Sequence, residues 1–259
     1  MKKGKKLYEG KAKIIYATND KSLVIQHFKD DATAFNNKKR AKIDGKGILN
    51  NRISEYILSN LNEVGIKNHL VKRINMREQL VKSVEIIPIE FVVRNIATGS
   101  LTNRLGIEEG TVLDYPLIEY CLKNDDLGDP LVSREHILSF NWMNIMELEL
   151  VNDQCKRIND FLQGMFRGVG IKLVDFKLEF GRSGQDNEII LADEISPDTC
   201  RLWDSRTEKK LDKDIFRKDL GNLIEGYQEI AKRLDILHEQ SNIRPIKFPK
   251  PKAVKIKKK

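Results

Sequence analysis

The sequence contains few cysteines, few histidines and no long apolar run. Its three cysteines, Cys121, Cys155 and Cys200, are odd in number and far apart, which suits a reducing compartment and gives no metal-ligand spacing. The four histidines are scattered as widely. No apolar run approaches the roughly 20 residues of a membrane span, and the basic N-terminus lacks the apolar stretch of a secretory signal. We therefore expect a cytoplasmic protein with no membrane association and no cysteine–histidine metal site.

Acidic residues are absent from the C-terminal stretch Arg244–Lys259, which holds eight basic residues and three prolines. This stretch accounts for the whole formal charge of +8, so residues 1–243 carry no net charge. The neutral body disfavours a basic face for nucleic acid. Lysines and prolines of this kind are typical of a solvated tail, and a protein that binds nucleic acid through the tail is the alternative. We predict no nucleic-acid partner.

The order of apolar patterns favours an α+β fold. The first ~85 residues are rich in strand patterns, interrupted by one helical stripe at Leu49–Val64. Two further helical stripes run through Leu148–Met165 and Phe216–Leu234, the latter capped by Asp212 or Asp214. Strands and helices thus come in blocks rather than in regular alternation. The strands expected in the first half are Leu7–Tyr8, Lys13–Ala17, Leu23–Phe28, His69–Ile74, Gln79–Ser83 and Ile86–Arg94.

The length of 259 residues is enough for two domains. We expect a β-rich N-terminal domain (1–84), a larger α+β domain (85–243) and the basic tail (244–259).

Two acidic segments predict a metal site. Asp175–Gly181 alternates strictly, with apolar residues on one face and Asp175, Lys177 and Glu179 on the other. A hairpin connection follows, and the returning apolar run ends in Asp193-Glu194. Pairing of the two strands brings Glu179 close to one of these acids, and the spacing does not choose between them. Carboxylates repel one another unless a cation joins them, and Mg²⁺ prefers one or two carboxylates together with phosphate oxygens.

The segment Glu9–Lys13 (EGKAK) lies between two expected strands. Gly10 allows a tight turn, and Lys11 and Lys13 put positive charge beside backbone N–H groups, which suits a polyphosphate. The segment has one glycine and matches neither of the common glycine-rich phosphate motifs. A charged hairpin loop without a ligand is the alternative.

A second basic group follows Pro88. Glu90 and Arg94 share one face of an expected strand, and a short turn ending in Ser100 comes next. Arginine, serine and turn amides together suit a phosphate monoester. An Arg94–Glu90 ion pair that closes the sheet face is the alternative.

Two polar loops have either ordinary or ligand-binding interpretations. In Cys121–Pro130, acids surround Lys123, which is either a simple turn or a lysine that neutralises a transferring phosphoryl group. Asp30–Asn37 is small and polar, and loops of this composition often hold ligands.

Five segments together closely resemble the SAICAR synthetase family, in order and at compatible spacing from about Leu7 to Leu237. They are LYEGKAK (7–13), PIE…RN…GS (88–100), KND…DP (123–130), DFKLEFG (175–181) and DEISPD…RLWD (193–204). Some members of the family carry an acid where this chain has Asn36.

The resemblance implies an enzyme of purine biosynthesis. Members of the family join L-aspartate to the carboxylate of carboxyaminoimidazole ribotide (CAIR) with ATP and Mg²⁺, through an acyl phosphate, and release ADP and phosphate. The implied fold is an N-terminal antiparallel β domain and a larger α+β domain in a kinase-like or ATP-grasp-like arrangement, with the active site in the cleft between them. A homodimer or larger homo-oligomer is also implied.

The resemblance also assigns roles to residues. ATP would lie against a phosphate-covering loop and an adenine-binding connection, formed by Gly10, Lys11, Ala12, Lys13, Val84 and Ile86. Of the two acids left open above, it selects Asp193, which would hold Mg²⁺ with Glu179. Lys123 and Lys177 would balance charge at the transferred phosphoryl group. The ribotide phosphate would bind Arg94, Ser100 and Arg201, with Glu90 and Asp198 nearby. No motif assigns the aspartate site.

Overall fold

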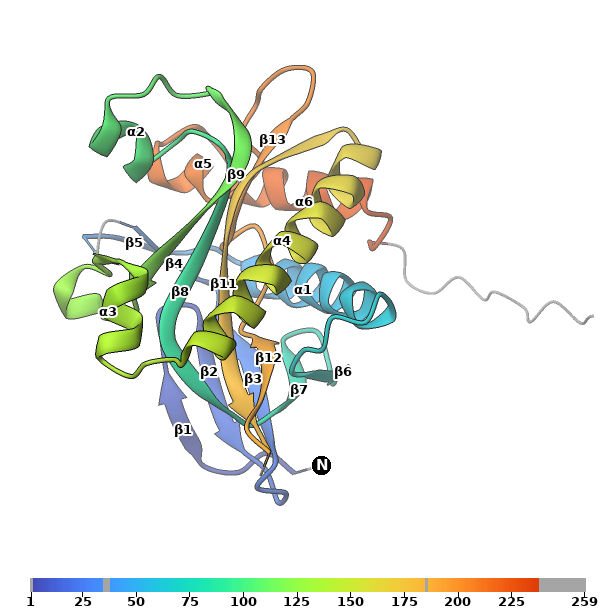
Figure 1. The fold of residues 1–259 in the computed structure, drawn as a ribbon. Helices are drawn as coiled ribbons and strands as arrows, with labels where there is room; N and C mark the ends of the chain where they lie inside the picture. Colours follow the sequence, from blue (N-terminus) through green and yellow to red (C-terminus); the bar gives the residue numbers. More distant parts are fainter. Residues whose placement is uncertain (1, 35–37, 185, 238–259) are drawn as a thin grey trace, which may run out of the picture.

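The computed structural model describes residues 2–34, 38–184 and 186–237. Two antiparallel sheets organise it (Figure 1). The first has the strand order β1-β2-β3-β7-β6, and in the second β10-β9-β8-β11-β12 is extended by β13, which pairs with β11. The fold is therefore mixed α/β with antiparallel sheets, as predicted. The strands of the first sheet are β1 (Lys6–Glu9), β2 (Lys13–Ala17), β3 (Leu23–Phe28), β6 (Leu70–Arg73) and β7 (Glu78–Lys82).

The second sheet contains β8 (Val84–Ile96), β9 (Val112–Leu122), β10 (Leu131–Val132), β11 (Ile171–Ser183), β12 (Glu188–Ala192) and β13 (Cys200–Asp204). Its two long central strands, β8 and β11, pair directly, with Glu90 opposite Glu179 and Arg94 opposite Asp175. The predicted alternation is confirmed in both strands. Their apolar faces are buried, and Phe91 meets Phe180 edge-on with ring centroids 5.5 Å apart.

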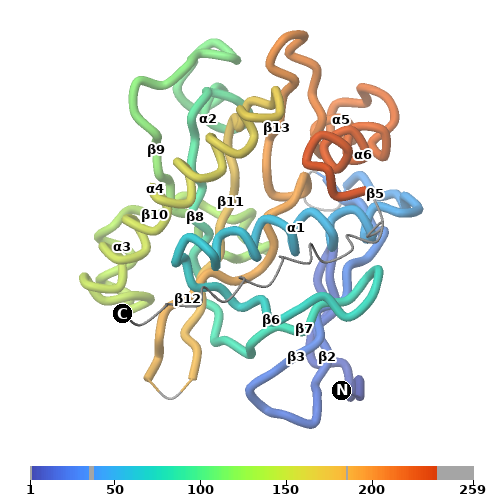
Figure 2. Tube along the Cα trace, turned by 90° about the vertical axis from the view of Figure 1, so that its right-hand side faces the viewer, coloured from blue at the N-terminus to red at the C-terminus, as the bar shows by residue number. Residues whose placement is uncertain are grey.

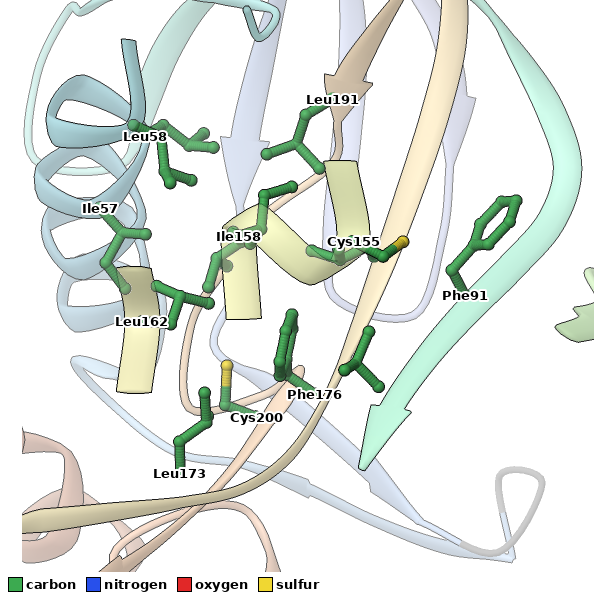
Figure 3. Packing of buried hydrophobic residues seen from close by; sticks show 14 of the residues in the cluster. Ile57, Leu58, Phe91, Cys155, Ile158, Leu162, Leu173, Phe176, Leu191 and Cys200 are labelled. Atoms are coloured by element: carbon green, nitrogen blue, oxygen red, sulfur yellow. The ribbon is translucent and has the colours of Figure 1, made fainter. Parts of the chain in front are cut away.

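Helices α1 (Lys46–Glu63) and α4 (Ile145–Gly168) carry much of the core. The predicted stripe of α4 is buried except for the half-buried Met165. Figure 3 shows Cys155, Ile158 and Leu162 close to Phe176 of β11. A capping box at Asn144 and Glu147 begins this helix. Figure 2 shows α1 running between α6 and the β6–β7 hairpin. The smaller helices are α2 (Ser100–Leu105), α3 (Arg134–Ser139) and the 3₁₀ turn η1 (Asp125–Leu127).

The single helix expected over Phe216–Leu234 is wrong. The structure has two helices, α5 (Asp214–Arg217) and α6 (Leu223–Arg233). Between them Gly221 adopts φ 126°, and the Asn222 side chain then caps α6 by accepting from the Ile224 N–H. The apolar periodicity continued across the break, and so it concealed this turn.

The polar loop expected at Asp30–Asn37 is also wrong in part. Asp31–Ala34 forms β4, which pairs with β5 (Lys39–Lys42). Ala32 and Ala34 are buried, so small apolar residues every second position make this segment a strand. Asn36 and the tail 244–259 lie outside the described residues. Among the described helices, none is long and apolar enough to cross a membrane.

Gly226 allows α6 to pack closely beside α5. A Cβ at this position would lie 2.5 Å from Ile215 Cδ1 and 2.7 Å from the Leu211 carbonyl oxygen. Gly164, inside α4, has open space for the same atom. Gly226→Ala should therefore lower the free energy of unfolding by about 1–3 kcal/mol through overpacking. Gly164→Ala should raise it by about 0.5–1 kcal/mol through helix propensity.

Urea unfolding of the two variants measures both effects. Equal changes of the same sign would show that helix propensity alone determines both, and that the contact between α5 and α6 is loose.

Candidate active site

A cavity of about 730 Å³ lies where the two sheets meet, within the size range of small-molecule sites. A hydrogen bond links the two sheets beside the cavity: the N–H of His69, which lines the cavity, donates to the Leu191 carbonyl oxygen at 2.9 Å. Every residue that the sequence assigned to a site lines this cavity: Gly10, Lys11, Ala12, Lys13, Val84, Ile86, Glu90, Arg94, Ser100, Lys123, Lys177, Glu179, Asp193, Asp198 and Arg201. The structure therefore brings together segments that are far apart in the sequence.

Glu179 projects from β11 between two lysines. Its Oε1 accepts hydrogen bonds from Lys123 Nζ at 2.7 Å and Lys177 Nζ at 2.8 Å. Lys177 also donates to Glu90 Oε1 at 2.6 Å. Because Glu90 and Glu179 face each other across the β8–β11 pair, Lys177 holds together two carboxylates that would otherwise repel.

Asp193 follows β12 directly, and its backbone adopts φ 58°, a conformation uncommon outside glycine. Lys13 Nζ donates to Asp193 Oδ1 and lies 2.9 Å from Glu194 Oε1. The hairpin pairs Glu179 with Ala192, the residue before Asp193. The sequence spacing did not choose between Asp193 and Glu194, and in the structure both acids pair with Lys13.

The pKa values in this group reflect a balance between burial and charge. Burial alone would raise the pKa of Asp193, but the ammonium groups of Lys13, Lys177 and Lys123 outweigh it and hold the pKa below its usual range. The pKa of Glu179 is lowered in the same way, chiefly by Lys177 against the effect of burial. Burial also opposes the charge of Lys177, yet the surrounding carboxylates raise its pKa well above the usual value. All of these groups are therefore charged at neutral pH.

The donor set fits a hard divalent cation. No group of three or more histidine, cysteine or acidic residues is arranged for a metal within the described ranges, but Mg²⁺ needs only one or two carboxylates when phosphate oxygens and water complete its shell. Glu179 and Asp193 present such carboxylates to one cavity. Glu194 Oε2 is buried and has no hydrogen-bond partner in the part of the chain described, so the region has unused acceptor capacity.

The segment 9–13 closes the cavity near these acids. The Gly10 N–H donates to the Lys13 carbonyl oxygen at 2.9 Å, which forms the tight turn. Lys11 Nζ donates to Asp125 Oδ1 at 2.6 Å, so the turn contacts the loop that contains Lys123. Further along the same wall, Val84 and Ile86 line the cavity with the apolar side chains of Leu7, Ile15, Val24 and Val81.

Arginines dominate the other end. Arg94 donates to Asp175 Oδ2 at 2.8 Å, to Glu119 Oε2 at 2.7 Å and to Ser100 Oγ at 3.1 Å. Arg201 shares Asp175 Oδ2 at 2.8 Å. The alternative of an arginine–glutamate pair that closes the sheet face is wrong only in its partner, because Arg94 pairs with Glu119 and Glu90 binds Lys177.

Asp198 is surrounded by groups that the sequence did not single out. Lys46 Nζ and the Tyr227 hydroxyl each donate to it at 2.5 Å, and Lys213 Nζ lies 3.8 Å away. Lys46 is fully buried. Tyr227 belongs to an apolar stripe that predicts only core packing, so periodicity could not separate its hydroxyl from the packing of its ring.

The charges of the cavity wall are segregated. At the end near segment 9–13, the lining acids outnumber the lining lysines by one: Glu90, Asp125, Asp129, Glu179, Asp193 and Glu194 against Lys11, Lys13, Lys82, Lys123 and Lys177. At the other end, Arg94, Arg201, Lys213 and Arg217 outnumber Asp175 and Asp198. One end therefore suits a cation and the other suits anions.

Comparisons with known proteins find relatives from one family. The family model of SAICAR synthetase matches residues 6–234. A phosphoribosylaminoimidazole-succinocarboxamide synthase from Pelagibacter ubique is 72% identical over the full length of both chains. The crystal structure of such a synthase from Ehrlichia chaffeensis is 54% identical, has a TM-score of 0.89 and covers 91% of this chain and 100% of that one. A structure of SAICAR synthetase in complex with ADP is 43% identical, with a TM-score of 0.85 and coverage of 88% and 96%.

Lys177→Met should destabilise the protein most at high pH. Without the ammonium, Glu179 loses the group that lowers its pKa most and keeps the repulsion of Glu90, so its folded-state pKa rises relative to that in the wild type. The resulting loss of stability is present at pH values above the raised pKa of Glu179. It disappears as the pH falls through that pKa, because the carboxylate then becomes protonated. We expect the free energy of unfolding to fall by about 2 kcal/mol at pH 8 and by clearly less at pH 5.

Lys172→Met is the matched control, because Lys172 lies on the same strand and pairs with Glu208 at the surface. Lys172→Met should change the free energy of unfolding by no more than about 0.5 kcal/mol. Urea unfolding at both pH values measures the difference, and a loss for Lys177→Met that does not depend on pH would contradict the electrostatic explanation.

Proposed function

Because the chain belongs to the SAICAR synthetase family, we propose that it joins L-aspartate to the carboxylate of CAIR with cleavage of ATP to ADP and phosphate, in purine biosynthesis. The observation that supports this most directly is the segregated cavity. A reaction between ATP, a phosphorylated ribotide and a dicarboxylic amino acid needs a cation site and an anion site within reach of each other. It needs no protein nucleophile.

ATP would lie against the first sheet and the beginning of β8. The segment 9–13 would cover the phosphates with Gly10, Lys11, Ala12 and Lys13. The apolar wall near Val84 and Ile86 would hold adenine, with backbone groups of this connection as hydrogen-bond partners.

Glu179 and Asp193 would hold Mg²⁺. When bound, the ion would neutralise charge on the terminal phosphates and help to orient them. Lys123 and Lys177 would place positive charge beside the transferred group, where negative charge spreads over its oxygens. The hydrogen bonds of both lysines to Glu179 support this role, because they fix the two ammonium groups at the acidic end of the cavity.

The chemistry has two steps. A carboxylate oxygen of CAIR attacks the γ-phosphorus, so a P–O bond forms, the bond to ADP breaks and an acyl phosphate results. The neutral amine of aspartate then attacks the acyl carbon, a C–N bond forms, phosphate leaves and the amine loses a proton to the surroundings. Phosphorylation is needed because a free carboxylate is a poor electrophile.

The ribotide phosphate would bind Arg94, Ser100 and Arg201. Arg94 and Arg201 already share Asp175 and hold fixed positions, so their remaining N–H groups are preorganised for phosphate oxygens. Glu90 and Asp198 would lie near the rest of the ribotide.

We further propose that residues 1–84 form the ATP-covering domain, that 85–243 carry the metal and ribotide sites, and that the enzyme works in the cytoplasm as a homodimer or larger homo-oligomer. The family resemblance supports these assignments. Size-exclusion chromatography with light scattering tests the assembly, and a monomeric mass at micromolar concentration would contradict it.

A coupled ADP assay tests the proposed function. ADP release at a full rate should require CAIR, L-aspartate and ATP together, because the acyl phosphate is discharged only by the amine. Omission of any one of the three should lower the rate at least a hundredfold. Sustained ADP release with CAIR and ATP but without aspartate, together with a stable phosphorylated product, would instead indicate a kinase.

Ser100→Ala tests the phosphate end. Loss of the hydroxyl beside Arg94 should raise the KM for CAIR about tenfold or more, the effect of losing one hydrogen bond to a charged group, and leave the KM for ATP within twofold. Thr102→Ala in the same helix is the control, because the Thr102 hydroxyl donates to the Gly99 carbonyl oxygen within the turn. Equal effects of Ser100→Ala on both substrates would place the ribotide phosphate elsewhere.

A further inference from the structure

Lys213 is a buried ammonium with an incomplete set of partners. It precedes α5 and lines the cavity, and its side chain is 12% exposed. Among the described residues, the one ion pair found for its Nζ is with Asp198 Oδ2 at 3.8 Å, which is too long for a hydrogen bond. An ammonium has three donors, so Lys213 has donors left for a ligand.

Asp198 cannot neutralise this lysine by itself. Its Oδ2 accepts from Lys46, and its Oδ1 accepts from the neutral Tyr227 hydroxyl. Two ammonium groups thus share one carboxylate in a buried place. Burial lowers the pKa of Lys213, Asp198 offsets only part of this, and the positive charges of Lys46 and Arg217 add to the lowering.

The neighbouring cations have fixed partners. Arg201 bonds to Asp175 and Asp214, and Arg217 donates to Asp214 Oδ1 at 2.6 Å. Lys213 lies beyond this chain of ion pairs, on the side of Asp198. There α5 packs against β4, and Thr33 of that strand lines the cavity.

We propose that Lys213 binds a carboxylate of the aspartate substrate. This inference rests on the proposed function, in which two anionic substrates meet ATP. The ribotide phosphate is matched by Arg94, Ser100 and Arg201, and the nucleotide phosphates by the opposite end of the cavity. Aspartate brings two carboxylates that still need a cation. A carboxylate at Lys213 would complete the hydrogen bonds of this ammonium and neutralise the excess positive charge around Asp198.

Steady-state kinetics of Lys213→Met and Lys213→Arg test the proposal, with Lys218→Met as the matched control. Lys218 also adjoins α5, but it is more exposed and donates to Glu109 at the surface. For Lys213→Met we expect the KM for aspartate to rise at least tenfold, while the KM values for CAIR and ATP stay within twofold. Lys213→Arg keeps the charge and should show a smaller rise, again for aspartate alone. Lys218→Met should change none of the three.

A comparison of substrates adds a measurement that misfolding would not reproduce. L-Asparagine and L-isoasparagine each replace one carboxylate of aspartate with an amide. The wild type should prefer aspartate over the amide that lacks the carboxylate bound by Lys213. In Lys213→Met this preference should be at least tenfold smaller, because the lysine and the carboxylate act as a pair.

Three outcomes would overturn the proposal: an unchanged KM for aspartate, an equal rise in the KM for CAIR, or an undiminished preference over both amides. Failure of the proposed function would look different. In that case the wild type itself would show no ADP release that depends on aspartate.

Discussion

The register between β8 and β11 determines the geometry of the whole site. This antiparallel pair places Glu90 opposite Glu179 and, four residues away, Arg94 opposite Asp175. Four residues of a strand span about 13 Å. The paired strands β8 and β11 therefore hold the acidic end of the cavity and its arginine end at about this distance from each other. A shift by one residue would turn these charged side chains into the core and Phe91 toward the cavity. The fully buried Ile89, Phe91 and Val93 prevent such a shift.

The acidic end is held together by lysines. Lys13, Lys123 and Lys177 bring carboxylates close to one another that would otherwise repel, and buried ion pairs of this kind contribute little net stability. Their arrangement is better explained by function, because the same acids and ammonium groups can serve a divalent cation and a phosphoryl group. At the other end, arginines anchored by Asp175 and Asp214 keep their direction without a ligand. Lys213 is the exception there, since it lacks such an anchor.

Local patterns of the sequence predicted the strands and helices well, but they did not predict which side chains of different elements contact one another. The period of two in 175–181 and the helical stripe of α4 were confirmed because one face of each is buried along its whole length. The break between α5 and α6 was missed because the apolar spacing continues across it. The partner of Arg94 could not be predicted, since Asp175 lies 81 positions further along the chain and reaches it only through the pairing of β8 with β11. The charged role of Lys46 was concealed for the same reason, because its partner Asp198 is remote in sequence. The roles proposed for the site residues rest on the family resemblance, and the side-chain contacts that position these residues could be seen only in the fold.

The most direct test of this account is a crystal structure with Mn²⁺, a non-hydrolysable ATP analogue and CAIR, in which anomalous scattering locates the metal. We expect one ion within about 2.0–2.5 Å of a carboxylate oxygen of both Glu179 and Asp193, with nucleotide phosphate oxygens completing its shell. The ribotide phosphate should lie against Arg94 and Arg201. An ion bound to nucleotide but held by neither carboxylate, or a ribotide phosphate at the acidic end, would contradict the charge segregation on which the proposed function depends.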